Sequence, residues 1–409
     1  MKILLANATA YPRIGGVENS LLYIGCELLL AGHEVKVFCL KFSPDEPLQM
    51  EHDGLEIIRR PCTADRWPHM QSLSRVDVVQ QAIPAILDEY RPDAIWCRST
   101  PVGVGIRRSG YAGPLLQIFP TNAKMHCRGS FLQTRGLPLG RRLMLLGLWP
   151  SAYFASARLE RELSLQCQAV VFSENMRRQL LAGFPENARA CHVIHPGVDS
   201  RIFSPENGVR LLAAIEQKYG LNRNDPVVLY VGRLSNAKHI PLLMDALSVL
   251  QKDTKLVLVG SGPEEPRLKR YARRLGIARQ CIFAGVQHEM LPGFYAISRV
   301  CVLPTTTESF GQVYLESLAS GTPAVGFAGD GRRILTATDE IIQDGKTGGV
   351  VKKINARALA EKIDSILSLD PGAYALMARR ARDDVRERFS WRSFVAEALL
   401  LSTRTRPVA

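Results

Sequence analysis

The sequence lacks a hydrophobic run long enough to cross a membrane. Its longest apolar stretch, Leu143 to Ala157, falls short of the roughly 20 residues that a spanning helix needs, and Pro150 interrupts it. The first residues, up to Gly16, hold one Lys and a short apolar run broken by Asn, Tyr and Pro. They predict a first strand and turn rather than a signal peptide. We therefore expect a cytoplasmic protein that does not cross a membrane.

Paired cysteines are also missing. Nine cysteines are scattered through 409 residues, and no two of them form a C-x-x-C pair. This odd, scattered set argues against a disulfide framework and against a structural zinc site, and it fits a reducing compartment. No G-x-G-x-x-G follows the first predicted strand, so a dinucleotide cofactor is only weakly indicated.

Acidic residues are absent from Ala94 to Leu159, and the whole chain carries a net charge of +13. Such a charge favours an anionic ligand, an anionic lipid surface or nucleic acid. The segment is rich in aliphatic residues and no nucleic-acid-binding module is recognisable, which argues against nucleic acid. It predicts either an acceptor or membrane surface, or an ordinary helix whose apolar side packs in the core. The basic residues assigned to that surface are Lys124, Arg128, Arg141 and Arg142.

Short β-branched runs alternate with helical patterns along the whole chain. Strands are predicted at 2–6, 34–40, 55–60, 94–97, 115–119, 169–173 and 191–195 in the first half. In the second half they are predicted at 227–232, 255–260, 281–285, 300–304 and 323–327. Helical patterns between them include 17–32, 237–251 and 264–276. This alternation predicts an α/β fold with parallel sheets covered by helices.

Two doubly wound domains are predicted, because 409 residues exceed one core and the strand series restarts near residue 225. We place the first domain at 1–200 and the second at 201–385, with a linker near 197–225. The segment 386–409 is predicted to be a helix and tail that pack back on the first domain. Ligands of such sheets bind outside the carboxyl ends of the strands, so the cleft between two domains is the expected site.

Three glycine-containing turns follow predicted strands. Their glycines are Gly15, Gly16, Gly232, Gly260 and Gly262. The first pair opens a helix and lets backbone N–H groups reach a phosphate, although a plain strand-to-helix turn is an equal alternative. The second turn is "GRLSNAK", with Arg233 and Lys238. The guanidinium of the arginine can donate two parallel hydrogen bonds to a diphosphate, and the ammonium of the lysine supplies a compact positive charge. The alternative is that both residues are ordinary solvated surface charges. Three such turns from two domains nevertheless strengthen the interpretation that they bind phosphate.

Two glutamates, Glu308 and Glu316, bracket the stretch "ESFGQVYLE". A helix predicted over 310–320 leaves the first in a loop and puts the second about two turns on. Eight helical residues span about 12 Å, whereas glycosidase carboxylate pairs lie about 5–9.5 Å apart. The spacing argues weakly against an acid/base pair and is compatible with carboxylates that hold separate parts of one long ligand. The alternative is that neither glutamate binds a ligand. One would then interact favourably with the dipole at the helix N-terminus, and the other would be solvated.

Together with "HPGVD" at 195–199, these turns and the E-x7-E element make the chain resemble the retaining GT-B glycosyltransferases of family 4 over nearly its whole length. The resemblance implies two Rossmann-like domains that face each other across a cleft. The first would bind the acceptor and the second the nucleotide sugar. It also implies transfer of a hexose with retained configuration and no cofactor or metal, and the absence of a D-x-D sequence agrees.

The same resemblance gives each residue a role. Arg233 and Lys238 would neutralise the donor diphosphate and the leaving group. Glu308 would hold hydroxyls of the transferred sugar, Glu316 would hold the ribose, and Gly16 would let the first domain approach the phosphates. The remaining donor-binding residues of the second domain are Ser309, Phe310, Gly311 and Gln312, and the N–H groups of the last three would approach sugar or phosphate.

The chain departs from the family pattern at three places. Family members usually carry a His just after the strand equivalent to 115–119, whereas here the nearest histidine, His126, comes several residues late. We assign His126 to the catalytic set, with an exposed loop histidine as the alternative. The Gly that usually follows the loop lysine is His239 here, and the segment 329–349 differs from the usual glycine-rich loop. That loop often faces donor or acceptor, so the sugar is left open.

The predicted function is transfer of a hexose from a UDP- or GDP-sugar to a glycan or lipid-linked acceptor in bacterial surface polysaccharide synthesis. The partners are then the sugar nucleotide, the acceptor and an anionic inner-membrane surface, with no nucleic acid. One alternative is another GT-B nucleotide-sugar enzyme such as an epimerase, which needs no acceptor. A second is a non-catalytic nucleotide-sugar-binding subunit of a transferase complex.

Overall fold

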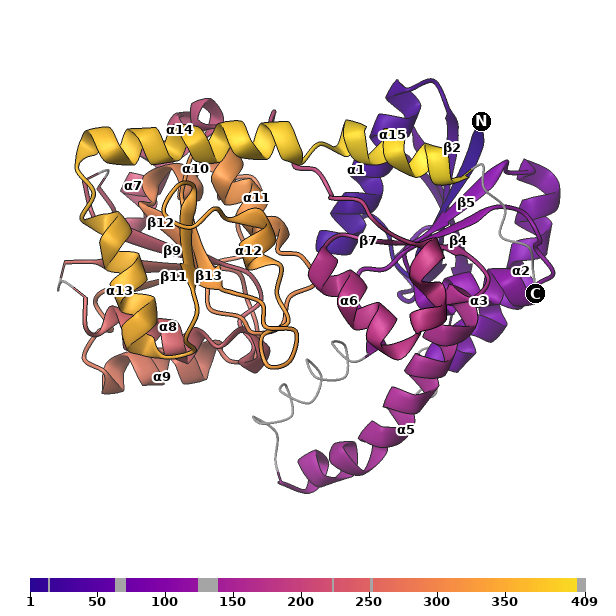
Figure 1. Ribbon diagram of the computed structural model, residues 1–409, viewed down its shortest axis with the longest axis horizontal. Coiled ribbons are helices and arrows are strands. Elements are labelled where there is room, and N and C mark those ends of the chain that lie inside the picture. The colour runs from indigo at the N-terminus through magenta and orange to yellow at the C-terminus, as the bar shows by residue number, and fades with distance from the viewer. Residues whose placement is uncertain (14, 63–70, 124–138, 223, 251–252, 403–409) are drawn as a thin grey trace. The chain divides into compact units, whose positions relative to one another are not determined.

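The computed structural model describes residues 1–13, 15–62, 71–123, 139–222, 224–250 and 253–402 (Figure 1). These residues form two compact units. Unit 1 takes those within Met1–Phe131, Pro138–Gly197 and Trp391–Ala409, and unit 2 takes those within Val198–Ser390. Each unit is an α/β domain with one sheet, as the alternation of strands and helices predicts.

Unit 1 is built on an eight-stranded sheet with the order β3-β4-β2-β1-β5-β6-β7-β8. All neighbouring strands are parallel except β3 and β4, which pair antiparallel. The strands are β1 (Lys2–Ala6), β2 (Glu34–Lys41), β3 (Gln49–His52), β4 (Leu55–Pro61), β5 (Ala94–Cys97), β6 (Leu115–Ile118), β7 (Gln168–Val171) and β8 (Cys191–Val193). Because β2 and β5 lie on opposite sides of β1, the strand order reverses at β1.

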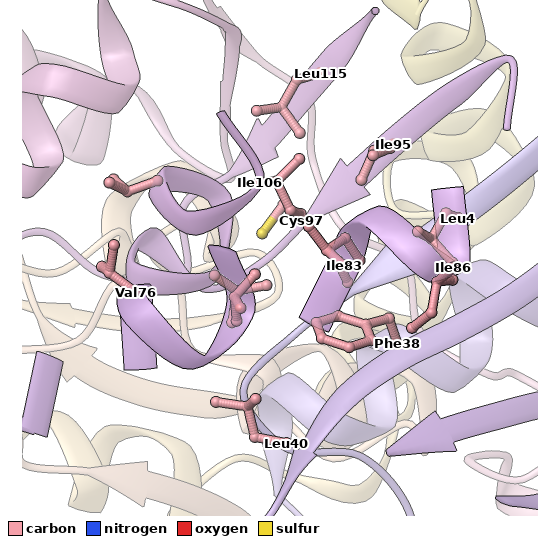
Figure 2. Packing of buried hydrophobic residues seen from close by; sticks show 14 of the residues in the cluster. Leu4, Phe38, Leu40, Val76, Ile83, Ile86, Ile95, Cys97, Ile106 and Leu115 are labelled. Atoms are coloured by element: carbon pink, nitrogen blue, oxygen red, sulfur yellow. The ribbon is translucent and has the colours of Figure 1, made fainter. Parts of the chain in front are cut away.

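Helices cover this sheet and bury its β-branched side chains. They are α1 (Gly16–Leu30), α2 (Gln71–Tyr90), α3 (Thr100–Arg108), α5 (Leu139–Ser164), α6 (Glu174–Gly183) and α15 (Trp391–Ser402), with a short 3₁₀ helix at Pro185–Ala190. Figure 2 shows part of the core, in which Ile83 and Ile86 from α2 pack with Leu4, Phe38 and Ile95 from three strands. Truncating one such buried Ile to Ala typically costs about 2–5 kcal/mol of stability.

Unit 2 has a six-stranded, all-parallel sheet with the order β11-β10-β9-β12-β13-β14. Its strands are β9 (Val227–Val231), β10 (Lys255–Val259), β11 (Cys281–Gly285), β12 (Val300–Leu303), β13 (Ala324–Phe327) and β14 (Gly348–Val351). Its helices are α7 (Pro205–Tyr219), α8 (Ile240–Leu247), α9 (Glu265–Arg274), α10 (Leu291–Ile297), α11 (Gln312–Ala319), α12 (Thr338–Ile341), α13 (Ala356–Leu367) and α14 (Pro371–Arg388). The order reverses at β9, so the carboxyl ends of β9 and β12 flank this unit's switch point.

The C-terminal helix α15 belongs to unit 1, as predicted. Its Trp391 stacks on Tyr23 of α1, with ring centroids 5.8 Å apart. At its other end, the buried indole of Trp96 in β5 donates a 2.6 Å hydrogen bond to the hydroxyl of Ser402. The buried side chains of α15, among them Phe394, Val395 and Leu401, therefore form the face that packs within unit 1, and Figure 1 shows the helix beside α1.

Three local predictions were wrong. The sequence did not reveal β3 and β14, and β3 makes the first sheet mixed rather than parallel. The expected linker near 197–225 contains α7, because Ser204 caps the helix and the stretch buries an apolar face. The helix predicted over 237–251 is broken at His239. Helix α5 runs through Pro150.

None of the helices within the described ranges is long and apolar enough to cross a membrane. For α5, charged residues at both ends shorten the apolar stretch, as its sequence indicates.

Candidate active site

Lys238 and Glu308 meet beyond the carboxyl ends of two neighbouring strands in unit 2. The loop after β9 carries the lysine and the loop after β12 carries the glutamate. Lys238 Nζ lies 2.5 Å from Glu308 Oε2, and each side chain is 25% exposed. The structure thus brings together two of the predicted catalytic side chains, and both can still be reached by a ligand.

The loop that carries Arg233 and Lys238 has a fixed backbone. Gly232 adopts φ +144°, a conformation that favours glycine. The buried Tyr230 donates a 3.0 Å hydrogen bond to the carbonyl of Arg233, and burial raises the pKa of this phenol far above its usual value. Since the phenol stays protonated, it remains a donor that holds the loop at the end of β9.

His239 follows the loop lysine, at the position where the family resemblance implies a glycine. Its φ is +50°, in the left-handed region, which explains why glycine suits the position. The ring nitrogen Nε2 of His239 lies 3.1 Å from Oγ1 of Thr306 in the loop after β12. A second contact therefore joins the loop of Lys238 to the loop of Glu308.

Gly260 and Gly262 of the segment "VGSGP" (259–263) are needed because the backbone of a neighbouring loop leaves no room for a Cβ atom. A Cβ on Gly260 would lie 2.1 Å from the carbonyl oxygen of Gly232, and one on Gly262 would lie 2.2 Å from that of Leu234. The N–H of Leu234 donates a 2.9 Å hydrogen bond to the carbonyl of Ser261, which holds the two loops against each other. Close packing of two loops accounts for both glycines, and the predicted donor-binding role of each remains a prediction.

Helix α11 begins just after the "ESFG" sequence. Its N-cap is Gly311, with φ +107°, where a Cβ would also meet the Tyr314 ring at 2.6 Å. Phe310 is buried and packs edge-on against Phe389, so its side chain anchors the turn while its N–H stays near the helix start. Because α11 starts at Gln312, only half of the Glu308–Glu316 interval is helical. The helical rise of about 12 Å over eight residues therefore does not apply to the whole interval.

Glu316 lies within α11 and accepts a 2.9 Å hydrogen bond from the hydroxyl of Tyr295 in α10. Burial raises the pKa of Glu316 to about 7, and the bond from Tyr295 opposes part of that rise. The Glu316 side chain is only partly exposed, so it is a carboxyl held in a fixed orientation. Such a group suits recognition of hydroxyls better than a solvated surface role.

The helix-opening glycines of unit 1 differ from each other. Gly15 is extended and caps α1, and a Cβ there would lie 2.5 Å from Glu18 Oε2. Gly16 is exposed and a Cβ would meet nothing within 4 Å. Open space beside the first turn of a 15-residue helix is compatible with approach of a phosphate.

Several predicted residues cannot be placed. His126, Lys124 and Arg128 lie outside the described residues. Arg141 and Arg142 lie on α5, where only the backbone is described. The described residues contain no group of three or more His, Cys, Asp or Glu side chains that could hold a metal ion.

A pocket in unit 1 contains residues that the sequence reading did not single out. The pocket, of about 430 Å³, lies at the carboxyl ends of β1, β5 and β6. Asn7, Arg98 and Glu160 line it and are all buried. Burial raises the pKa of Glu160 to about 7, while the N–H of Ala123, 2.6 Å away, opposes that rise. The position of Arg98 directly after a predicted strand was the available signal.

Comparison with known proteins covers both units. The model of the family "Glycosyltransferase Family 4" matches residues 14–201, and that of "Glycosyl transferases group 1" matches residues 213–384. The chain is 28% identical to the GDP-mannose-dependent alpha-(1-6)-phosphatidylinositol monomannoside mannosyltransferase of Mycolicibacterium smegmatis, over 98% of each chain. It is 29% identical to the D-inositol 3-phosphate glycosyltransferase of Mycobacterium marinum over 58% of this chain and 49% of that protein.

Among solved structures, sucrose-phosphate synthase from Thermosynechococcus elongatus aligns with a TM-score of 0.79 at 22% identity, over 98% of each chain. At this identity the likeness concerns the fold alone. It confirms the GT-B fold class, with its two Rossmann-like domains.

Proposed function

Because the chain belongs to the group 1, family 4 glycosyltransferases, which use nucleotide sugars, we propose that it transfers a hexose from a UDP- or GDP-sugar with retained anomeric configuration. The proposed acceptor is a glycan or lipid-linked molecule of a bacterial surface polysaccharide. The observation that carries the proposal is the Lys238–Glu308 pair, set beside the N-terminus of α11 at the switch point of unit 2.

Each group of the pair would act on a different part of the donor. Lys238, with Arg233, neutralises the charge that develops on the departing diphosphate, and Glu308 accepts hydrogens from hydroxyls of the hexose. The N–H groups at the start of α11 face the diphosphate region. Glu316 accepts hydrogens from the ribose hydroxyls, as its fixed orientation favours. Stabilising the leaving group in this way is a large catalytic term in such sites.

The reaction would proceed on one face of the sugar. The bond between C1 of the hexose and the diphosphate oxygen breaks, and its electron pair goes to that oxygen. The acceptor hydroxyl attacks C1 from the same face and gives its proton to the departing diphosphate. No step requires a metal ion or another cofactor, because Arg233 and Lys238 supply the positive charge.

A GDP-sugar is favoured by one relative, since the M. smegmatis protein is named as GDP-mannose-dependent and is aligned over nearly its whole length. That relative also acts on a phosphatidylinositol mannoside, which supports a lipid-linked acceptor here. We therefore propose that the enzyme acts at the cytoplasmic face of the inner membrane, with Arg141 and Arg142 of the acid-free segment as its contact with the lipid.

The test combines binding and turnover. A thermal-shift panel of UDP, GDP, ADP and their sugars identifies the donor, because a ligand of the folded state raises its apparent stability. NMR of the product then gives the anomeric configuration. An inverted linkage would refute retention, and donor turnover to an epimer without acceptor would favour an epimerase. Nucleotide binding without turnover for any acceptor would favour a non-catalytic subunit.

Membrane contact is tested separately by flotation with anionic vesicles. The proposal expects the protein to float with the vesicles and the pair of changes Arg141→Glu and Arg142→Glu to release it. A protein that does not float, together with an unchanged double variant, would remove the membrane part and leave the transferase proposal intact.

A further inference from the structure

The pocket of unit 1 lies where a doubly wound sheet presents its ligand site. The strand order reverses at β1, and the pocket opens at the carboxyl ends of β1, β5 and β6. Its volume of about 430 Å³ is in the range of small-molecule sites. Asn7 and Thr9 after β1, Arg98 after β5 and Asn122 after β6 give it a polar floor.

Arg98 is the unusual member of this pocket. It is 2% exposed, and its guanidinium lies 4.8 Å from the ring centroid of Phe172. One terminal nitrogen donates to the hydroxyl of Ser20, but Nε has no hydrogen-bond partner. Among the described residues, no carboxylate lies within 4.0 Å of the guanidinium. A buried cation with an unused hydrogen-bond donor destabilises the folded state. An anion or another strong hydrogen-bond acceptor that binds to it removes that destabilisation.

The other charged groups of the pocket compensate that cation only in part. Burial lowers the pKa of Arg98 to about 9, and the nearby charge of Glu18 offsets only a share of that fall. Glu18 accepts a 2.5 Å hydrogen bond from the hydroxyl of Thr9. Glu160 accepts the N–H of Ala123, and with a pKa raised to about 7 by burial it is only partly ionised near neutrality. Arg75 of α2 adds a second guanidinium to the lining. Two guanidinium groups, whose fork geometry matches phosphate oxygens, therefore face the same small space.

We propose that this pocket binds the acceptor through a phosphoryl group, which Arg98 holds with Arg75 beside it. The inference rests on the proposed function and deepens it, since it states the chemistry by which the acceptor is recognised. The groups proposed for the donor diphosphate, Arg233 and Lys238, are in unit 2. Loss of Arg98 should therefore weaken the acceptor and spare the nucleotide.

The test measures binding of two matched probes to the full chain by calorimetry. Inositol phosphate carries the phosphoryl group and inositol lacks it. We expect measurable binding for the first only, and at least about tenfold weaker binding in Arg98→Gln and Arg75→Gln, because a charge-assisted contact is lost. The matched control is Arg189→Gln, an exposed arginine of unit 1 outside the pocket, which should bind like the parent protein.

Nucleotide binding by the same variants shows that they are folded and separates the two proposals. If Arg98→Gln does not fold, Arg75→Gln carries the test, because Arg75 is less buried. Equal binding of inositol and inositol phosphate, or unchanged binding in the folded variants, would overturn the inference while nucleotide binding upholds the proposed function. Loss of nucleotide affinity in Arg98→Gln would also overturn it and assign Arg98 to the donor. Failure of the parent protein to bind any nucleotide would instead refute the proposed function.

The phosphoryl group can belong to a free sugar phosphate or to a lipid headgroup. Vesicles of phosphatidylcholine, with and without phosphatidylinositol, distinguish the two sources. Phosphatidylinositol-dependent retention that Arg98→Gln abolishes would support the inference and assign a lipid. Binding of free inositol phosphate without vesicle retention would support it and assign a soluble acceptor.

Discussion

The hydroxyl of Tyr295 donates a 2.9 Å hydrogen bond to Glu316, and both side chains lie in unit 2. Burial raises the pKa of Glu316 to about 7 from 4.5, so this carboxyl changes charge near neutrality in the free protein. Hydroxyls of a bound ribose would donate to its ionised form and lower its pKa on binding. Nucleotide binding would then be coupled to loss of a proton.

We therefore expect nucleotide affinity to rise with pH up to about 7 and to level off above it. One pH unit below the midpoint the affinity should be about tenfold weaker, because about one molecule in ten is ionised there. Calorimetry across this range measures it. Tyr295→Phe should move the midpoint upward, since the lost bond had lowered the pKa, and Glu316→Gln should remove the pH dependence. A flat profile in the parent protein would contradict the ribose role.

Stability of the free protein should change in the opposite direction. The folded-state pKa of Glu316 is raised above its unfolded value of 4.5, so ionisation between about pH 4.5 and 7 destabilises the fold as pH rises. Glu316→Gln should accordingly raise the melting temperature at pH 8 while it weakens nucleotide binding. Lower stability of the variant at that pH would show that the carboxylate is stabilised by contacts other than Tyr295.

Lys238→Ala and Glu308→Gln should each reduce transfer by well over tenfold, about 1.4 kcal/mol or more of transition-state stabilisation. Since the two side chains are in contact, the double variant should lose less than the product of the single losses. Steady-state kinetics of the three variants measures this. Lys353→Ala, at an exposed position of the same unit, is the control. Near-normal rates for both single variants would remove the pair from the active site.

At position 239 we expect glycine to be less destabilising than alanine, which is the reverse of the usual order within a chain. Both His239→Gly and His239→Ala lose the contact to Thr306, but only glycine relieves the left-handed backbone. That conformation costs a residue with a side chain about 1–2 kcal/mol. The glycine variant should therefore be the more stable of the two by about 1 kcal/mol, as urea unfolding would show. A more stable alanine variant would mean that the backbone relaxes at this position.

Gln117 should be replaceable with a gain in stability. It is fully buried in β6, and neither amide atom has a hydrogen-bond partner. Gln117→Met keeps the shape and removes two unsatisfied polar atoms, each of which costs about 1–3 kcal/mol when buried. We expect a higher melting temperature with unchanged transfer. A loss of stability would show that the amide has a partner in solution, such as an ordered water.

The sequence predicts most of this fold because parallel strands are buried on both faces and therefore appear as continuous apolar runs. β1 and β5 have the predicted bounds for this reason. The edge strand β3 is partly exposed and polar, and β14 begins with two glycines, so neither carries that signal. Position 239 was recognised as unusual, but only the backbone φ shows why a helix cannot pass through it.

The candidate site was predictable where one short segment holds its residues and not where the chain must fold to assemble it. Glu308, Gly311 and Glu316 stand in one recognisable stretch. The contact of Lys238 with Glu308 depends on two loops brought together by the pairing of β9 with β12. For Arg98 the position directly after a predicted strand was the one signal, because its importance comes from burial without an ion pair, which residue type alone does not express.

The packing of α15 has a consequence for synthesis on the ribosome. Unit 1 begins at Met1, yet it also contains α15, whose Ser402 accepts a hydrogen bond from the indole of Trp96. Every described residue of unit 2 precedes α15 in the chain. Domains generally fold as units while the chain emerges, the first one first. Here the order is inverted: the second unit can finish while the first still waits for its last helix, with part of its apolar surface exposed to chaperones.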